Sequence, residues 1–361
     1  MIPIKDLSSL HTQQVELLQS LIAIPSFSRE ESETADILQS FFKAKEIPSE
    51  RSGNNIWVKN LFFDAKKPSI LLNSHHDTVK PNAGYTRDPF NPSIEDGKLF
   101  GLGSNDAGGP LVALIAAFLW FYGKENLPFN LILAATAEEE ISGKNGIESI
   151  LPLLPVFELA IVGEPTLMQA AVAEKGLMVI DCVVKGKAGH AAREEGENAL
   201  YKALDDLQTI KDFEFKKVST FLGKSKVSAT VIQAGSQHNV VPDECSFTLD
   251  VRVTDAYTLE EILGEVSQAI KAEMSPRSKR LNSSKLPENH HAYQTLKALG
   301  TPTYGSPTLS DQALIPYPSF KMGPGDSARS HTADEFIYVQ EIHEGIQGYI
   351  QFLTHYIQTY P

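Results

Sequence analysis

Short apolar strands alternate with helical stretches along much of the chain. The apolar runs at Ser69–Ser74, Asn130–Thr136 and Glu158–Val162 have the length of buried strands, and Ser319–Met322 is a weaker fourth. Helical spacing separates these runs, most clearly at Gly108–Tyr122. Such alternation is typical of an α/β domain built on a mainly parallel sheet, so we expect that fold class.

The pattern changes near Glu174, where longer alternating strands begin. In this second region the expected strands and helices cover residues 176–187, 197–210, 226–234, 246–254 and 259–272. The polar segment Met274–Asn289 is expected to be the linker that leads back to the first region. We therefore predict a discontinuous α/β domain at residues 1–173 and 287–361, with an inserted α+β domain at residues 174–286.

Composition and charge exclude several classes of protein. The 361 residues suit two domains, and 42% hydrophobic with 21% charged residues is typical of a soluble globular protein. A net charge of -13 without a cluster of Lys and Arg argues against a nucleic-acid partner. The apolar run Leu111–Tyr122 is too short to span a membrane, and residues 1–20 lack the apolar core of a signal peptide. Cys182 and Cys245 are expected to be buried, reduced thiols, so we predict a cytoplasmic protein.

Polar side chains follow the end of each strand of the first domain. His75 follows the first strand, the triplet at residues 138–140 follows the second, Glu164 the third, and His331 lies beyond the fourth. Asp106 stands in a Gly-rich loop at the start of the helix Gly108–Tyr122. Ligands of open α/β sheets bind beyond the carboxyl ends of the strands, so we expect these side chains to converge in one crevice.

Histidines and carboxylates without a thiolate form a mixed nitrogen and oxygen donor set, which suits zinc, cobalt or manganese. Five candidate ligands exceed the usual three of one catalytic zinc ion and indicate a pair of ions. Taken singly, each signal is weak, because a lone histidine after a strand is usually a packing residue and an acidic triplet is usually a solvated helix start. We interpret His76 as a packing neighbour and His290–His291 as solvated.

At these positions the sequence resembles the M20 metallopeptidase family, which includes acetylornithine deacetylase and succinyl-diaminopimelate desuccinylase. The matching segments occur in the family's order and extend over most of the chain. They are residues 75–81 (HHDTVKP), 103–109 (GSNDAGG), 138–140 (EEE), 162–165 (VGEP), 186–190 (GKAGH) and 323–331.

The resemblance implies two metal ions that share one carboxylate. His75, Asp106 and Glu164 would bind the first ion, and Asp106, Glu140 and His331 would bind the second. Zinc is the expected metal, and cobalt or manganese could substitute for it.

The resemblance also implies roles for residues that are not ligands. Glu139 would be the general base that takes a proton from water and passes it to the leaving amine. Asp77 would orient His75 through the second ring nitrogen. His190 lies in the inserted domain, and in this family such a histidine reaches the partner subunit's site to stabilise the oxyanion. We therefore expect a homodimer, and a lid or dimerisation role for the inserted domain.

Four further residues are candidate substrate contacts. Asn239 and Arg252 match family positions that touch substrate. Lys175 stands where succinyl-specific members tend to carry arginine, and lysine lacks the bidentate fork for a carboxylate. Arg329 is a candidate for holding a substrate carboxylate, with a surface salt bridge as the equal alternative.

These residues predict a metal-dependent hydrolase, and the resemblance implies an amidohydrolase that removes an acetyl or succinyl group from the nitrogen of an amino acid. The resemblance to acetylornithine deacetylase implies N-acetylornithine, in arginine biosynthesis, as the substrate, and N-succinyl-diaminopimelate is the nearest alternative. A two-metal dipeptidase or aminopeptidase is a second hypothesis, and it would need an acidic residue such as Glu138 or Asp311 to recognise a free amine. A third is a relative without activity that only binds its ligand, which the presence of Glu139 argues against.

Overall fold

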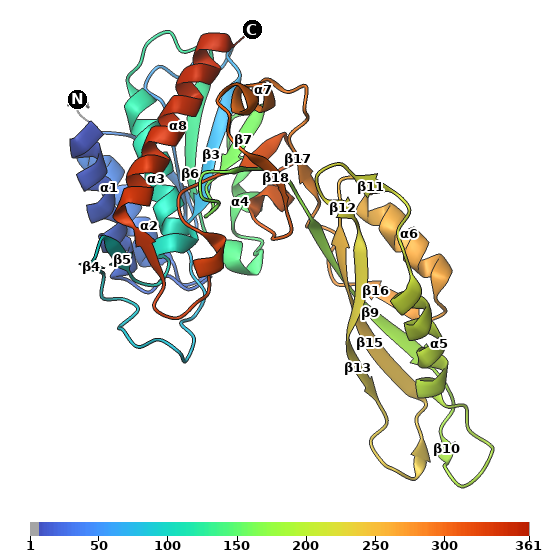
Figure 1. Ribbon diagram of the computed structural model, residues 1–361. Helices are drawn as coiled ribbons and strands as arrows, with labels where there is room; N and C mark the ends of the chain where they lie inside the picture. Colours follow the sequence, from blue (N-terminus) through green and yellow to red (C-terminus); the bar gives the residue numbers. More distant parts are fainter. Residues whose placement is uncertain (1–6, 361) are drawn as a thin grey trace. The chain divides into compact units, whose positions relative to one another are not determined.

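The computed structural model describes residues 7–360, and the chain divides into two compact units (Figure 1). The first unit contains residues up to 172, residues 285–304 and residues from 310 onward. The second contains residues 173–284 and 305–309. The segment 305–309 differs from our expectation, which assigned it to the first domain. It joins the second unit because the carbonyl of Ser306 accepts the backbone N–H of Lys175 at 3.2 Å.

The first unit is built on a mixed sheet with a parallel centre. The strand order is β1-β2-β6-β3-β7-β19-β8-β17, and β18 pairs with β8. The four central strands β6, β3, β7 and β19 are parallel to one another. The strands are β1 (Ser49–Ser52), β2 (Asn55–Lys59), β3 (Ser69–His75), β6 (Asn130–Thr136), β7 (Leu159–Val162), β8 (Ala170–Glu174), β17 (Ser284–Lys285), β18 (Thr303–Ser306) and β19 (Ser319–Lys321). The class predicted from the alternating strands and helices is confirmed.

Sequence patterning missed the edge hairpin of this sheet. Strands β1 and β2 are antiparallel, and β2 is antiparallel to β6. The β1 sequence is polar and only partly buried, so it carries no apolar signal. Gly53, with φ of 58°, makes the turn between the two strands.

Helices cover both faces of the sheet. On one face α3 (Gly109–Tyr122) packs on β3 and β6, with α1 (Leu7–Ile22) and α8 (Val339–Thr359) against it. On the other face α4 (Ile147–Ile150) packs over Leu71 and Ile132. The segment Ser104–Tyr122 has the length and apolar character of a membrane span, but 89% of its apolar window is buried inside the structure.

Helix α4 is only 4 residues long. Gly146 precedes it, and turns follow directly at residues 151–153. The remaining helices of this unit are α2 (Ser32–Ala44) and α7 (His291–Ala298), and a small sheet contains β4 (Ser93–Glu95), β5 (Lys98–Phe100) and β20 (Phe336–Tyr338).

The second unit is a four-stranded antiparallel sheet with two helices. The strand order is β13-β15-β9-β16, and apolar side chains of β9 and β15 form a core with α5 and α6. The elements are β9 (Gly176–Lys185), α5 (Ala199–Asp212), β13 (Lys226–Ala234), β15 (Glu244–Val253), α6 (Leu259–Ala269) and β16 (Glu273–Pro276), with short strands β10 (Gly189–His190), β11 (Val218–Ser219), β12 (Gly223–Lys224) and β14 (Val240–Val241). Both cysteines are reduced and buried in this unit.

The segment Met274–Asn289 is not simply a linker, as we expected. Its first residues belong to β16, which pairs with β9 at the edge of the sheet. Pro276 lacks a backbone N–H, and an edge strand tolerates this because one side of the strand needs no partner. The polar composition and the proline hid this strand from the sequence pattern.

Candidate metal centre

The candidate ligands follow neighbouring strands whose ends are level. The register pairs His75, the last residue of β3, with Thr136, the last residue of β6. It also pairs Val162, at the end of β7, with Asn73 and with Lys321. Because these strands are parallel and adjacent, the loops that follow them start at one edge of the sheet.

Four of the five candidate ligands are joined by short contacts. His75 Nε2 lies 3.3 Å from Asp106 Oδ1, and His331 Nε2 lies 3.7 Å from Asp106 Oδ2. His331 Nε2 also lies 3.0 Å from Glu140 Oε2. The two oxygens of Asp106 therefore face two different histidines, which is the geometry that a carboxylate shared by two ions requires.

Donor atoms cluster in two overlapping groups. In one group the ligand atoms of His75, Asp106 and Glu140 lie within 4.8 Å of one another, and in the other those of His75, Glu139 and Glu164 do. His75 is buried, whereas the side chain of His331 is 55% exposed, so one side of the cluster is open to solvent. The donor types and their spacing fit a pair of divalent ions.

Concentrated negative charge dominates the electrostatics of the cluster. Burial and the charges of Glu164 and Asp311 raise the pKa of Glu139 well above its usual range, against the attraction of His75. Burial would lower the pKa of His75, but Glu139 and Asp106 raise it well above normal. The hydrogen bond with Glu140 raises the pKa of His331 to about 9. Cations are the natural counter-charge for carboxylates packed this closely.

Asp77 fixes the turn that carries the candidate base. Its carboxylate accepts the backbone N–H of Glu139 at 3.0 Å and that of Glu140 at 3.2 Å, as well as the hydroxyl of Ser28 at 2.7 Å. His75 Nδ1 is closer to the Asp77 carbonyl oxygen (3.0 Å) than to the Asp77 carboxylate (3.5 Å). Asp77 therefore contacts His75, as expected, and also holds Glu139 and Glu140, which the sequence did not indicate.

Three loops of the centre are tied to one another. The side chain of Asn105 donates to the Asp326 carbonyl and accepts the Asp326 N–H, both at 3.0 Å. Gly325, with φ of 91°, has no room for a side chain beside Asn105. The N–H of Thr166, two residues after Glu164, donates to the carbonyl of Gly323 at 3.2 Å. These bonds connect the loops that carry Asp106, Glu164 and His331.

Sequence analysis missed Glu335, a buried carboxylate behind the Asp106 loop. It accepts the backbone N–H groups of Gly103, Asn105 and Asp106 at 3.1, 2.8 and 3.0 Å. Burial and the charge of Asp106 raise its pKa to about 7. Only its position four residues after His331 could have drawn attention to it.

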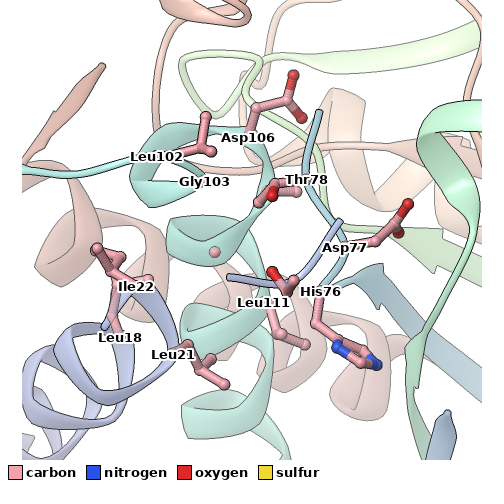
Figure 2. Close-up of a pocket in the computed structure, with 13 residues that line it drawn as sticks. Leu18, Leu21, Ile22, His76, Asp77, Thr78, Leu102, Gly103, Asp106 and Leu111 are labelled. Carbon is pink, nitrogen blue, oxygen red and sulfur yellow. The ribbon is translucent and has the colours of Figure 1, made fainter. Parts of the chain in front are cut away.

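A cavity of about 20 Å³ lies beside the Asp106 loop, and Figure 2 shows Asp77 and Asp106 among the residues that line it. Its apolar wall includes Leu18, Leu21 and Ile22 of α1. This volume is about that of one water molecule, so it cannot hold a substrate. The part of the cluster that is open to solvent is therefore the side of His331.

Four of the predicted site residues belong to the second unit. His190 is exposed in β10, which pairs with β14, and the N–H of Ala191 donates to the carbonyl of Asn239 at 2.9 Å. His190 and Asn239 are thus neighbours. Lys175 lies between β8 and β9, and Arg252 forms an ion pair with Asp250 at 2.8 Å.

Arg329 is engaged within the first unit. Its guanidinium donates to both carboxylate oxygens of Glu341, at 2.9 and 2.6 Å, and its side chain is 15% exposed. This is the salt-bridge alternative that the sequence left open for Arg329.

The histidines that we set aside have structural contacts. His76 is buried between Thr34 and Asn54, at 2.9 Å from each, as a packing residue should be. His291 differs from our expectation, because it is partly buried against Tyr356 and is not fully solvated.

Comparison with known proteins identifies relatives along nearly the whole chain. The model of peptidase family M20/M25/M40 matches residues 71–355. Acetylornithine deacetylase of Proteus mirabilis is 27% identical, over 90% of this chain and 91% of the relative. Succinyl-diaminopimelate desuccinylase of Wolbachia pipientis is 24% identical, over 96% and 94%. A dinuclear metal-binding peptidase of the M20 family from Bacillus subtilis has a similar fold, with a TM-score of 0.72 and 15% identity over 98% of this chain and 99% of that one.

Proposed function

This chain belongs to peptidase family M20/M25/M40, and from that premise we propose that it removes an acetyl or succinyl group from the nitrogen of an amino acid. N-acetylornithine is the substrate we expect first, which would place the enzyme in arginine biosynthesis. The observation that carries the hydrolase assignment is the cluster of His75, Asp106, Glu139, Glu140 and Glu164 at one edge of a parallel sheet.

Two divalent ions are the proposed cofactor, with zinc as the metal because the donors are imidazole and carboxylate. His75, Asp106 and Glu164 would hold one ion, and Asp106, Glu140 and His331 the other. Bound there, the ions would polarise the amide carbonyl and lower the pKa of a water molecule.

Glu139 is the proposed general base. Asp77 holds its backbone N–H, so the carboxylate starts from a fixed position beside the ligands. From that position Glu139 accepts a proton from water and delivers it to the leaving nitrogen. A group that only shuttles a proton must keep at least one carboxylate oxygen free of any ion.

Two carboxylates that a free-amine substrate could have used are already bonded. Asp311 is buried and accepts the side chains of Asn73 and Thr136, both at 2.7 Å. Glu138 is buried and accepts the amide of Asn145 at 2.8 Å. This favours an acylated nitrogen over the free amine that an aminopeptidase recognises.

A homodimer is part of the proposal, and its support is the exposure of His190 together with the resemblance stated above. In that arrangement His190 would complete the oxyanion site of the partner. Sedimentation and kinetics test it: loss of activity on dilution to monomers supports the dimer, and a fully active monomer contradicts it. A cytoplasmic location is also proposed, because both cysteines are free and buried, which suits a reducing compartment.

The test of the substrate is turnover of three compounds by the zinc-loaded protein: N-acetylornithine, N-succinyl-diaminopimelate and a dipeptide with a free amine. We expect the highest kcat/KM on N-acetylornithine. Faster turnover of the succinyl compound would transfer the assignment to that substrate. Hydrolysis of the dipeptide alone would reject N-acyl specificity while leaving the metal centre intact.

A further inference from the structure

The loop that carries Asp106 is held by one residue from another part of the chain. Glu335 is 2% exposed, and its carboxylate accepts the backbone N–H groups of Gly103, Asn105 and Asp106. Its backbone carbonyl accepts a fourth N–H, that of Gly101, at 3.0 Å. Four hydrogen bonds therefore hold residues 101–106 to Glu335.

This placement has an electrostatic cost. Glu335 accepts the backbone N–H of Asp106 at 3.0 Å, so two carboxylates lie close together here, and like charges repel. A neutral side chain would avoid that repulsion. Stability of the fold alone therefore does not account for a carboxylate at this position, whereas a rigid acceptor for three N–H groups does.

Glu335 also lies in the segment that carries His331. The neighbouring Asp334 accepts the N–H of Thr86 at 2.9 Å and that of Arg87 at 3.0 Å. The side chain of Asn82 donates to the His331 carbonyl at 3.1 Å. Residues 331–335 are thus fixed to the loop 82–87 by Asp334 and to the loop 101–106 by Glu335.

We propose that Glu335 is a positioning residue for the metal pair, which sets Asp106 at the distance from His331 that lets one carboxylate serve two ions. The distance at issue is the 3.7 Å between His331 Nε2 and Asp106 Oδ2. The inference rests on the proposed function only in needing a site for two ions, and it needs no particular substrate.

The test is a titration of metal-free protein with Co²⁺, followed by visible absorbance, for wild type, Glu335→Gln and Asp334→Asn. In Glu335→Gln the amide nitrogen cannot accept an N–H, so part of the loop loses its acceptor. We expect one of the two ions to bind about 10–100-fold more weakly, which is the usual effect of residues behind metal ligands. With N-acetylornithine, kcat should fall while KM stays near wild type, and excess metal should restore kcat.

Asp334→Asn is the matched control. Asp334 is the neighbour of Glu335 and also accepts several hydrogen bonds, but its donors belong to Thr86 and Arg87. It should shift the Co²⁺ affinity less than Glu335→Gln does. Wild-type affinity for both ions in folded Glu335→Gln, or an equal loss in both variants, would overturn the proposal. If Glu335→Gln does not fold, Glu335→Asp replaces it in the experiment. This variant keeps the negative charge but shortens the side chain by one methylene, and the same two outcomes would overturn the proposal.

Failure of the proposed function has a different signature. Wild-type protein that binds two Co²⁺ ions but hydrolyses no N-acyl amino acid rejects the substrate and still permits the comparison of variants. Wild-type protein that binds no Co²⁺ rejects both.

Discussion

The carboxylate of Asp77 accepts the backbone N–H of Glu139 at 3.0 Å. Its second oxygen accepts the N–H of the next residue, Glu140, at 3.2 Å. One buried carboxylate thus sets the position of both the proposed base and a proposed ligand.

Asp77→Asn should lower kcat about 10–100-fold with little change in folding. An asparagine presents one oxygen and one N–H₂ group, and that group cannot accept the N–H of Glu139 or Glu140. Steady-state kinetics with N-acetylornithine, alongside thermal unfolding, measures the effect. Ser28→Ala removes only the hydroxyl bond to Asp77 and should cost much less. Equal losses in the two variants would mean that the N–H bonds are not what matters.

His331→Ala should weaken the binding of one ion far more than that of the other. His331 contacts Asp106 and Glu140, whereas Glu164 groups with His75 on the other side. Calorimetric titration with Zn²⁺ should show one tight site preserved and one lost. His355→Ala, in the half-buried part of α8, serves as the control and should retain two sites. Loss of both ions in His331→Ala would argue against a divided ligand set.

Arg329→Gln and Glu341→Gln should have the same effect, because the two side chains form one bidentate ion pair that is mostly buried. Their effects on the free energy of unfolding should be non-additive, with a coupling of about 1 kcal/mol in a double-mutant cycle. If Arg329 instead held a substrate carboxylate, KM would rise in Arg329→Gln alone. Urea unfolding and KM values for the three variants separate the two roles.

Leu249→Ala should destabilise the second unit by about 2–5 kcal/mol, as expected for a fully buried leucine. Leu204→Ala, on the exposed side of α5, should cost far less because that leucine is 51% exposed. Denaturant unfolding followed by circular dichroism compares the two. Similar costs at both positions would contradict the core described for this unit.

The sequence predicted the parallel centre of the first unit because buried central strands are continuous apolar runs. Asn130–Thr136 matched β6 to the residue, and β3 ended one residue later than expected. Strand β1 and strand β16 escaped prediction for the same reason: both lie at the edge of a sheet, are only partly buried and carry polar residues. The apolar periodicity of a sequence reveals a strand only where its side chains are buried, and β1 and β16 have no fully buried residue.

The candidate site was partly predictable. His75 and Glu164 could be predicted because each follows the end of a strand. The carboxyl ends of parallel strands lie at the same edge of a sheet, so the two side chains were expected to converge. Glu335 could not be found this way, because its role depends on bonds to residues more than two hundred positions earlier in the chain. A carboxylate beside another acidic residue is normally solvated, and nothing local distinguishes Glu335 from that case.

Zinc titration of metal-stripped protein, with hydrolysis of N-acetylornithine measured at each step for wild type and Glu139→Gln, tests the central claim most directly. The account predicts that wild-type turnover appears and saturates with two equivalents of zinc. It also predicts that Glu139→Gln binds the same two equivalents and stays inactive. Turnover that needs no added metal, or an active Glu139→Gln variant, would contradict it.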